Sequence, residues 1–82
     1  MSAAQFKDQG NQAFKDGKYD EAVNFYTSAI NLAPNDHILY SNRSGSYASL
    51  AKYQEALEDA EICISLNPNF AKGILFIISL GY

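Results

Sequence analysis

Several features that identify particular protein classes are scarce or missing in this 82-residue sequence. It contains one cysteine and one histidine, so no intrachain disulfide can form and a Cys/His metal site lacks ligands. Its first residues carry neither the basic segment nor the apolar core of a secretion signal. We therefore expect a cytoplasmic protein that holds no metal and no cofactor.

Positive charge and long apolar segments are also scarce. Six basic residues stand against nine acidic ones, which gives a net charge of −3. Nucleic acids and anionic membranes are bound by Lys and Arg clustered over a broad face, and this sequence has no such cluster. The apolar residues 73–82 cover about half of the length that a membrane-spanning helix needs. We expect binding to neither nucleic acid nor a membrane.

No group of residues indicates catalysis. Cys63 occupies a position where the helical pattern requires a small packed residue, and His37 has no Ser, Cys or paired carboxylates beside it. We expect a buried, unreactive thiol, a surface imidazole and no enzymatic activity.

What the sequence does contain is a repeat with an offset of 34 residues. Eight residues recur as the same type one offset later, and a third copy begins and breaks off. The pairs are Lys18/Lys52, Tyr19/Tyr53, Glu21/Glu55, Ala22/Ala56, Ile30/Ile64, Leu32/Leu66, Pro34/Pro68 and Asn35/Asn69. Such a period indicates a repeat architecture, and repeat proteins usually function by presenting a surface.

Each copy has the periodicity of two helices joined by a tight turn. Apolar residues recur at helical spacing on both sides of Gly17 and on both sides of the Ala51-Lys52 turn. This pattern predicts an all-α chain in which Asp36 caps the third helix. The expected helices are 3–16, 19–32, 37–50, 53–66 and 71–80.

Small residues recur where paired helices must approach each other closely. Larger side chains at these positions would force the helices apart. The residues are Gly10, Ala22 and Ala29 in the first copy and Ser44, Ala56 and Cys63 in the second.

At these positions the chain resembles the tetratricopeptide repeat family, whose 34-residue unit places aromatic, glycine, alanine and proline residues in a fixed order. The matching residues are Phe6, Gly10, Ala13, Ala22, Tyr26, Ala29 and Pro34, and less strictly Tyr40, Ser44, Tyr47, Ala56, Ala60, Cys63 and Pro68. The resemblance implies a helix-turn-helix solenoid with two full repeats, 3–36 and 37–70. Residues 71–82 would hold the first helix of a partial third repeat, with an unusually apolar tail.

The resemblance also implies a concave face lined by the first helix of each repeat and a convex side formed by the second. Basic residues then gather on the concave side, at Lys7, Lys15, Arg43 and Lys72. The second helix of the second copy carries only acidic charges, which we expect to form an outer surface. These residues are Glu55, Glu58, Asp59 and Glu61.

Four residues resemble the carboxylate clamp found in co-chaperone members of the family. Lys7 and Asn11 lie one helical turn apart on one face, Asn42 lies on the next inward helix, and Lys72 begins the third. In the family this clamp binds the C-terminal Glu-Glu-Val-Asp tails of the seventy- and ninety-kilodalton heat-shock chaperones. A terminal Asp brings two carboxylates, and both need charge-assisted hydrogen-bond donors. Residues 39–44 and 67–73 add to the likeness to the N-terminal repeat domain of such a co-chaperone.

The clamp of the family has a fifth member, a basic residue one turn after the lysine of the third repeat. Here that position holds Phe76. A charge-assisted hydrogen bond contributes roughly 1.5–3 kcal/mol, or about ten- to a hundred-fold in affinity, so we expect weaker binding than is usual in the family. Two accessory contacts are also candidates. Phe14 could form an apolar wall, and Arg43 could hold an acidic peptide or equally span the surface between helices.

Two other functions stay open at this point. The chain could be a structural scaffold that associates with itself through the apolar tail, or a targeting module cut from an enzyme. The tail after Gly73 allows three interpretations: a genuine inward helix, a contact satisfied by another chain, or the foreign end of a truncated or frame-altered sequence.

Overall fold

The computed structural model describes residues 1–70, which form four α-helices and one short 3-10 helix and contain no strand. The helices are α1 (Ala3–Lys15), α2 (Tyr19–Leu32), α3 (His37–Ser49) and α4 (Tyr53–Leu66), followed by the 3-10 turn η1 (Pro68–Phe70). The prediction of an all-α chain is confirmed, although α1 and α3 end one residue earlier than expected. The helix predicted at 71–80 lies outside the described residues.

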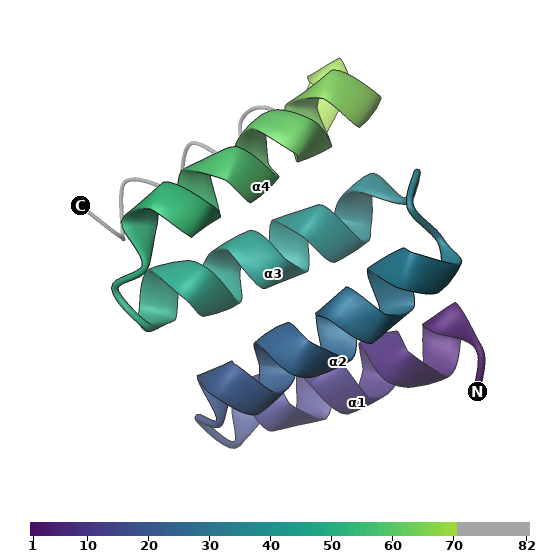
Figure 1. The fold of residues 1–82 in the computed structure, drawn as a ribbon, viewed down its shortest axis with the longest axis vertical. Helices are drawn as coiled ribbons and strands as arrows, with labels where there is room; N and C mark the ends of the chain where they lie inside the picture. Colours follow the sequence, from purple (N-terminus) through teal and green to yellow (C-terminus); the bar gives the residue numbers. More distant parts are fainter. Residues whose placement is uncertain (71–82) are drawn as a thin grey trace.

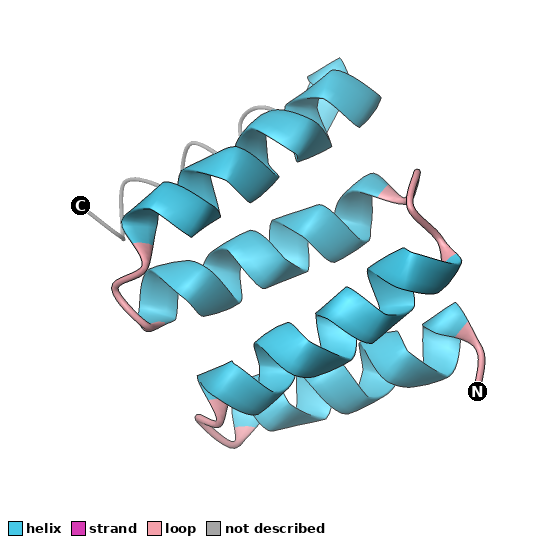
Figure 2. Cartoon of the chain, viewed as in Figure 1, coloured by secondary structure: helices cyan, strands magenta, loops and turns pink. Residues whose placement is uncertain are grey.

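The helices form two antiparallel hairpins that pack against each other (Figure 1). The first hairpin is α1 with α2, the second is α3 with α4, and α2 packs against α3 to join them. The connections between the helices are short (Figure 2). This arrangement places α1 and α3 close enough for their side chains to share a pocket.

Local sequence explains where the helices begin. α1 starts with a capping box, in which the Ser2 hydroxyl accepts from the Gln5 N–H at 3.2 Å and the Gln5 side chain accepts from the Ser2 N–H at 2.7 Å. α3 starts after Asp36, whose carboxylate accepts from the Ile38 N–H at 3.0 Å. The predicted cap at Asp36 is therefore confirmed.

The small residues predicted at the helix crossings are all buried. The approach is tight at Gly10, where a Cβ atom would lie 2.6 Å from the ring of Tyr26. Cys63 is completely buried, and this burial raises the pKa of its thiol, which disfavours the reactive thiolate. The prediction of a buried thiol at Cys63 is confirmed.

The expectation that Asp59 belongs to an acidic outer surface is wrong. Asp59 is 3% exposed, and its two carboxylate oxygens accept from Arg43 Nε and Nη2 at 2.7 Å each. Arg43 Nη1 also donates to the hydroxyl of Thr27 at 3.2 Å, so the pair connects α2, α3 and α4. Asp59 faces inward because a bidentate arginine partner offsets the cost of burying its charge.

His37 also differs from its expected surface position. The imidazole is half-buried, packs edge-on against Phe70 with ring centroids 5.0 Å apart, and shares a 3.1 Å hydrogen bond with the Asn67 amide. These contacts fix the start of α3 against η1.

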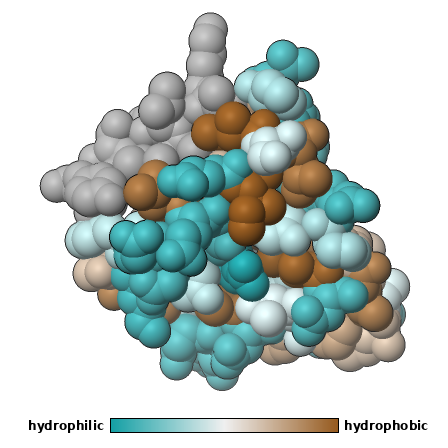
Figure 3. All heavy atoms as spheres, turned by 45° about the horizontal axis from the view of Figure 1, so that its top comes forward, coloured by the Kyte–Doolittle hydropathy of each residue, from teal (hydrophilic) through white to brown (hydrophobic). Residues whose placement is uncertain are grey.

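The described surface mixes hydrophilic side chains with apolar patches, as one face in Figure 3 shows. Leu32 and Ile62 are among the exposed large hydrophobic residues. None of the described helices is long and apolar enough to cross a membrane. Within residues 1–70, no group of His, Cys, Asp and Glu side chains is arranged to hold a metal ion.

Candidate functional site

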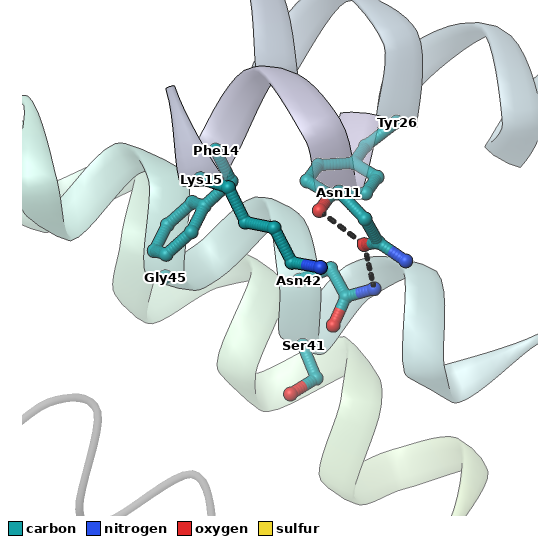
Figure 4. A pocket seen from close by; sticks show the side chains of 7 residues that line it. All are labelled: Asn11, Phe14, Lys15, Tyr26, Ser41, Asn42 and Gly45. Carbon is teal, nitrogen blue, oxygen red and sulfur yellow. Dashed lines mark hydrogen bonds between the residues drawn. The ribbon is translucent and has the colours of Figure 1, made fainter. Parts of the chain in front are cut away.

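A pocket of about 380 Å³ opens between the two hairpins (Figure 4). Helices α1, α2 and α3 all contribute to its wall. The lining residues are Asn11, Phe14, Lys15, Tyr26, Ser41, Asn42 and Gly45. The pocket therefore contains two of the residues that resemble a clamp, Asn11 and Asn42.

The fold brings Asn11 and Asn42 into contact although they come from different repeats. Asn42 Nδ2 donates to Asn11 Oδ1 at 3.4 Å, and the Tyr26 hydroxyl donates to the same oxygen at 2.6 Å (Figure 4). Burial raises the pKa of the Tyr26 hydroxyl, which keeps it protonated and available as a donor. Because two donors already occupy its oxygen, Asn11 keeps its amide N–H groups for a ligand.

Lys7 of the expected clamp is not among the described residues that line this pocket. Lys7 is half-buried on α1, one helical turn before Asn11, and forms no hydrogen bond or ion pair with another described residue. Lys7 and Asn11 therefore lie on the same face of α1. Lys72, like Phe76, lies outside the described residues.

Arg43 points away from the pocket despite following Asn42 in the sequence. Its guanidinium group is held by Asp59 and Thr27, and lies 5.8 Å from the ring centroids of both Tyr40 and Tyr47. Hydrogen bonding to Asp59 is the main cause that raises the pKa of Arg43. The geometry favours the second interpretation of Arg43, a contact that spans the helices.

Phe14 lies in the wall of the pocket, where its ring is 38% exposed. The ring packs edge-on against Tyr19 with centroids 5.1 Å apart, which limits its rotation. Phe14 can therefore offer an apolar surface to a bound chain.

Sequence reasoning missed three residues of this pocket: Tyr26, Ser41 and Gly45. Two of them could have been found from the repeat itself, because Ser41 and Gly45 lie one 34-residue offset after Lys7 and Asn11. Lys15, which the sequence places on the concave side, lies one turn after Asn11 and also lines the pocket. The repeat pattern predicts an aromatic residue at Tyr26 but not that its hydroxyl reaches the pocket from α2.

The described side chains give this site a definite chemical character. Amide donors, a lysine and an apolar wall surround an open space, which suits an extended chain that carries carboxylates.

Comparison with known proteins assigns relatives to both repeats. Tetratricopeptide repeat models match residues 3–36 and 38–70. The "Hsp70-Hsp90 organising protein" of Plasmodium falciparum is 48% identical over 73 residues, which are 89% of this chain and 29% of that protein. The chain therefore spans less than a third of that curated relative.

Two solved structures share the arrangement of the helices. The Sgt2 TPR domain from Aspergillus fumigatus has a TM-score of 0.88 at 29% identity, over 96% of this chain and 52% of that one. The first TPR of Spaghetti (RPAP3), bound to the HSP90 peptide SRMEEVD, has a TM-score of 0.84 at 32% identity, over 95% of this chain and 68% of that one.

Proposed function

The chain belongs to the tetratricopeptide repeat family, and on that premise we propose that it binds the free C-terminus of an acidic peptide. The ligand is the Glu-Glu-Val-Asp type of tail carried by the seventy- and ninety-kilodalton heat-shock chaperones. Lys7, Asn11, Asn42 and Lys72 hold the carboxylates of the terminal residue. The chain thus acts as a co-chaperone type of binding module and not as an enzyme.

The contact between Asn11 and Asn42 is the observation that carries this proposal. Two amides from different repeats meet at 3.4 Å beside an open pocket, and the buried Tyr26 hydroxyl orients one of them. A site for a carboxylate needs donors that are fixed before the ligand arrives, because their ordering then costs little on binding. Lys7, one turn before Asn11, adds the positive charge.

The relatives support the choice of ligand. One similar structure holds the HSP90 peptide SRMEEVD, and the curated relative is named for Hsp70 and Hsp90. Phe76 occupies the position where the family has a fifth basic residue, so we propose an affinity below the family norm.

The direct test compares two peptides that end in Glu-Glu-Val-Asp, one with a free C-terminus and one with a C-terminal amide. Calorimetric titration of the whole chain should show about ten- to a hundred-fold weaker binding of the amide, since it lacks one carboxylate and the charge-assisted bonds that carboxylate accepts. Equal affinity for the two peptides would show that the clamp is wrong, and would leave the scaffold interpretation as the better one.

A matched pair of lysine variants tests the location of the site. Lys7→Met should weaken binding of the free peptide about ten-fold or more, without loss of stability, because Lys7 has no partner among the described residues. Lys18→Met removes the same charge from a residue in a cleft lined by Gln12, Asp16 and Phe25, away from the pocket. Lys18→Met should leave the affinity unchanged, and similar losses in both variants would show attraction by net charge alone.

A further inference from the structure

We propose that Lys15 is a second cationic contact for the bound peptide and pairs with an acidic side chain three residues before its C-terminal residue. The inference rests on the proposed function and extends it from the terminal carboxylates to the upstream part of the ligand. For a Glu-Glu-Val-Asp tail, the partner of Lys15 is the first glutamate.

The position of Lys15 provides the first argument. Lys15 belongs to the last turn of α1 and lines the same pocket as Asn11 and Asn42. Figure 4 shows its side chain extending from α1 toward Asn42, so that the ammonium group lies over the pocket. The side chain is exposed and makes no hydrogen bond or ion pair with another described residue.

The distribution of charge provides the second argument. Among the basic side chains of residues 1–70, Arg43 is neutralised by Asp59. Lys18 and Lys52 are the N-cap residues of α2 and α4, at the turns between paired helices. Lys7 and Lys15 are therefore the two described basic side chains on α1 that no carboxylate already binds. An acidic ligand that reaches the pocket meets uncompensated positive charge at these two places.

The spacing between the two lysines selects the ligand residue. Lys7 and Lys15 are eight residues apart, which is about two turns and about 12 Å along α1. An extended peptide advances about 3.3 Å per residue, so it covers this separation in three to four residues. When Lys7 contacts the terminal residue, the residue three positions before it comes within reach of Lys15.

The size of the effect should be modest because Lys15 is exposed. Exposed ion pairs contribute about 0.2–1 kcal/mol, which corresponds to about a 1.5- to 5-fold change in affinity. The contribution should also shrink as salt is added, since screening acts on exposed charges. This behaviour separates Lys15 from the terminal clamp, whose loss has a larger effect.

A double-mutant cycle between the chain and the peptide tests the pairing. The probes are a peptide ending in Met-Glu-Glu-Val-Asp and two versions in which the first or the second glutamate is replaced by glutamine. The Lys15→Met substitution should weaken binding of the parent peptide about 1.5- to 5-fold. The Lys15→Met variant should bind the parent peptide and the peptide with glutamine at the first glutamate position equally well. Lys15→Arg should keep the coupling, and Lys18→Met should show none.

Thermal unfolding of the Lys15→Met variant serves as the control for stability. This control is needed because Lys15 lies in the last turn of α1, where a cation also interacts with the helix dipole. If Lys15→Met left the affinity for the parent peptide unchanged, or lowered the affinity for all three peptides equally, the pairing would be overturned. The clamp would still stand in that case if amidation of the peptide weakened binding. Coupling to the second glutamate alone would overturn the assigned position. Failure of the wild-type chain to bind any peptide with a free C-terminus would overturn both proposals.

Discussion

The two hairpins come from the same 34-residue pattern but contribute different things to the pocket. On the first hairpin the pattern carries Lys7 and Asn11, and one offset later the second hairpin carries Ser41 and Gly45. A Cβ atom added at Gly45 would meet no atom within 4 Å. At these matched positions the first repeat therefore carries donors and the second leaves space at Gly45, while the second repeat adds its own amide donor at Asn42.

The interiors of the hairpins differ in a similar way. In the first, Gly10 leaves room for the ring of Tyr26, which packs directly on it. In the second, the corresponding residues are Ser44 and Ala60, and the Ser44 hydroxyl donates to the carbonyl of Ala56 at 2.7 Å. The helices of the first hairpin pack around one large ring. The helices of the second pack through small residues and are also joined by the Arg43–Asp59 ion pair.

The largest expected effect comes from breaking that ion pair. Asp59→Ala should lower the free energy of unfolding by about 3 kcal/mol, because it leaves the mostly buried Arg43 guanidinium without its carboxylate. Urea denaturation followed by circular dichroism measures the loss. Glu61→Ala on the same helix is the control, since Glu61 is exposed, and should change stability by less than about 0.5 kcal/mol.

A second variant separates the burial of charge from the packing of the second hairpin. Replacing both partners by apolar residues, Arg43→Met with Asp59→Leu, should recover most of the stability that Asp59→Ala loses. If Asp59→Ala cost no more than Glu61→Ala, the ion pair would not be what closes the second hairpin.

Two glycine variants test the difference in packing between the hairpins, and their expected effects on stability are smaller than that of breaking the ion pair. Gly10→Ala should destabilise the chain by about 1–3 kcal/mol, because its Cβ would lie 2.6 Å from the buried ring of Tyr26. Gly45→Ala makes the same change on α3 in open space and should stabilise by about 0.5–1 kcal/mol, as expected for glycine in a helix. Thermal and urea unfolding of the two variants should therefore move in opposite directions. If both variants changed the stability in the same direction, the proposed packing difference between the hairpins would be wrong.

Much of this molecule could be predicted from the repeat, because local signals define its helices. The capping residue Asp36 and the periodicity of small residues predict the ends of the four described helices to within one residue. The predicted repeat layout also places Asn11 and Asn42 on neighbouring inward helices, and the structure brings the two amides into contact.

The interactions that escaped prediction connect residues without a local pattern. Asp59 has acidic neighbours at positions 58 and 61, so its sequence resembles a solvated surface, and only the fold brings Arg43 from α3 to it. The Tyr26 hydroxyl reaches Asn11 across a helix crossing for the same reason. Sequence periodicity gives the face on which a residue lies, but the partner on that face depends on side-chain reach across helices.

The smallest expected effect concerns one position in the turns inside the hairpins, where the two copies differ by one methyl group. Gly17 and Ala51 occupy equivalent positions, and both adopt left-handed backbone angles, with φ of 75° and 60°. Glycine adopts this conformation without strain, whereas an L-residue is strained there. Ala51→Gly should therefore raise the free energy of unfolding by about 0.5–1 kcal/mol, and Gly17→Ala should lower it by about 1 kcal/mol. Urea denaturation of the two single variants and of the double variant, Gly17→Ala with Ala51→Gly, measures these changes in the free energy of unfolding.

The double variant should have nearly the stability of the wild type, because it moves the strain from the second hairpin to the first. A stabilised double variant would mean that the second turn carries more strain than the first can acquire, and a destabilised Ala51→Gly variant would mean that the Ala51 side chain contributes packing that outweighs its backbone strain.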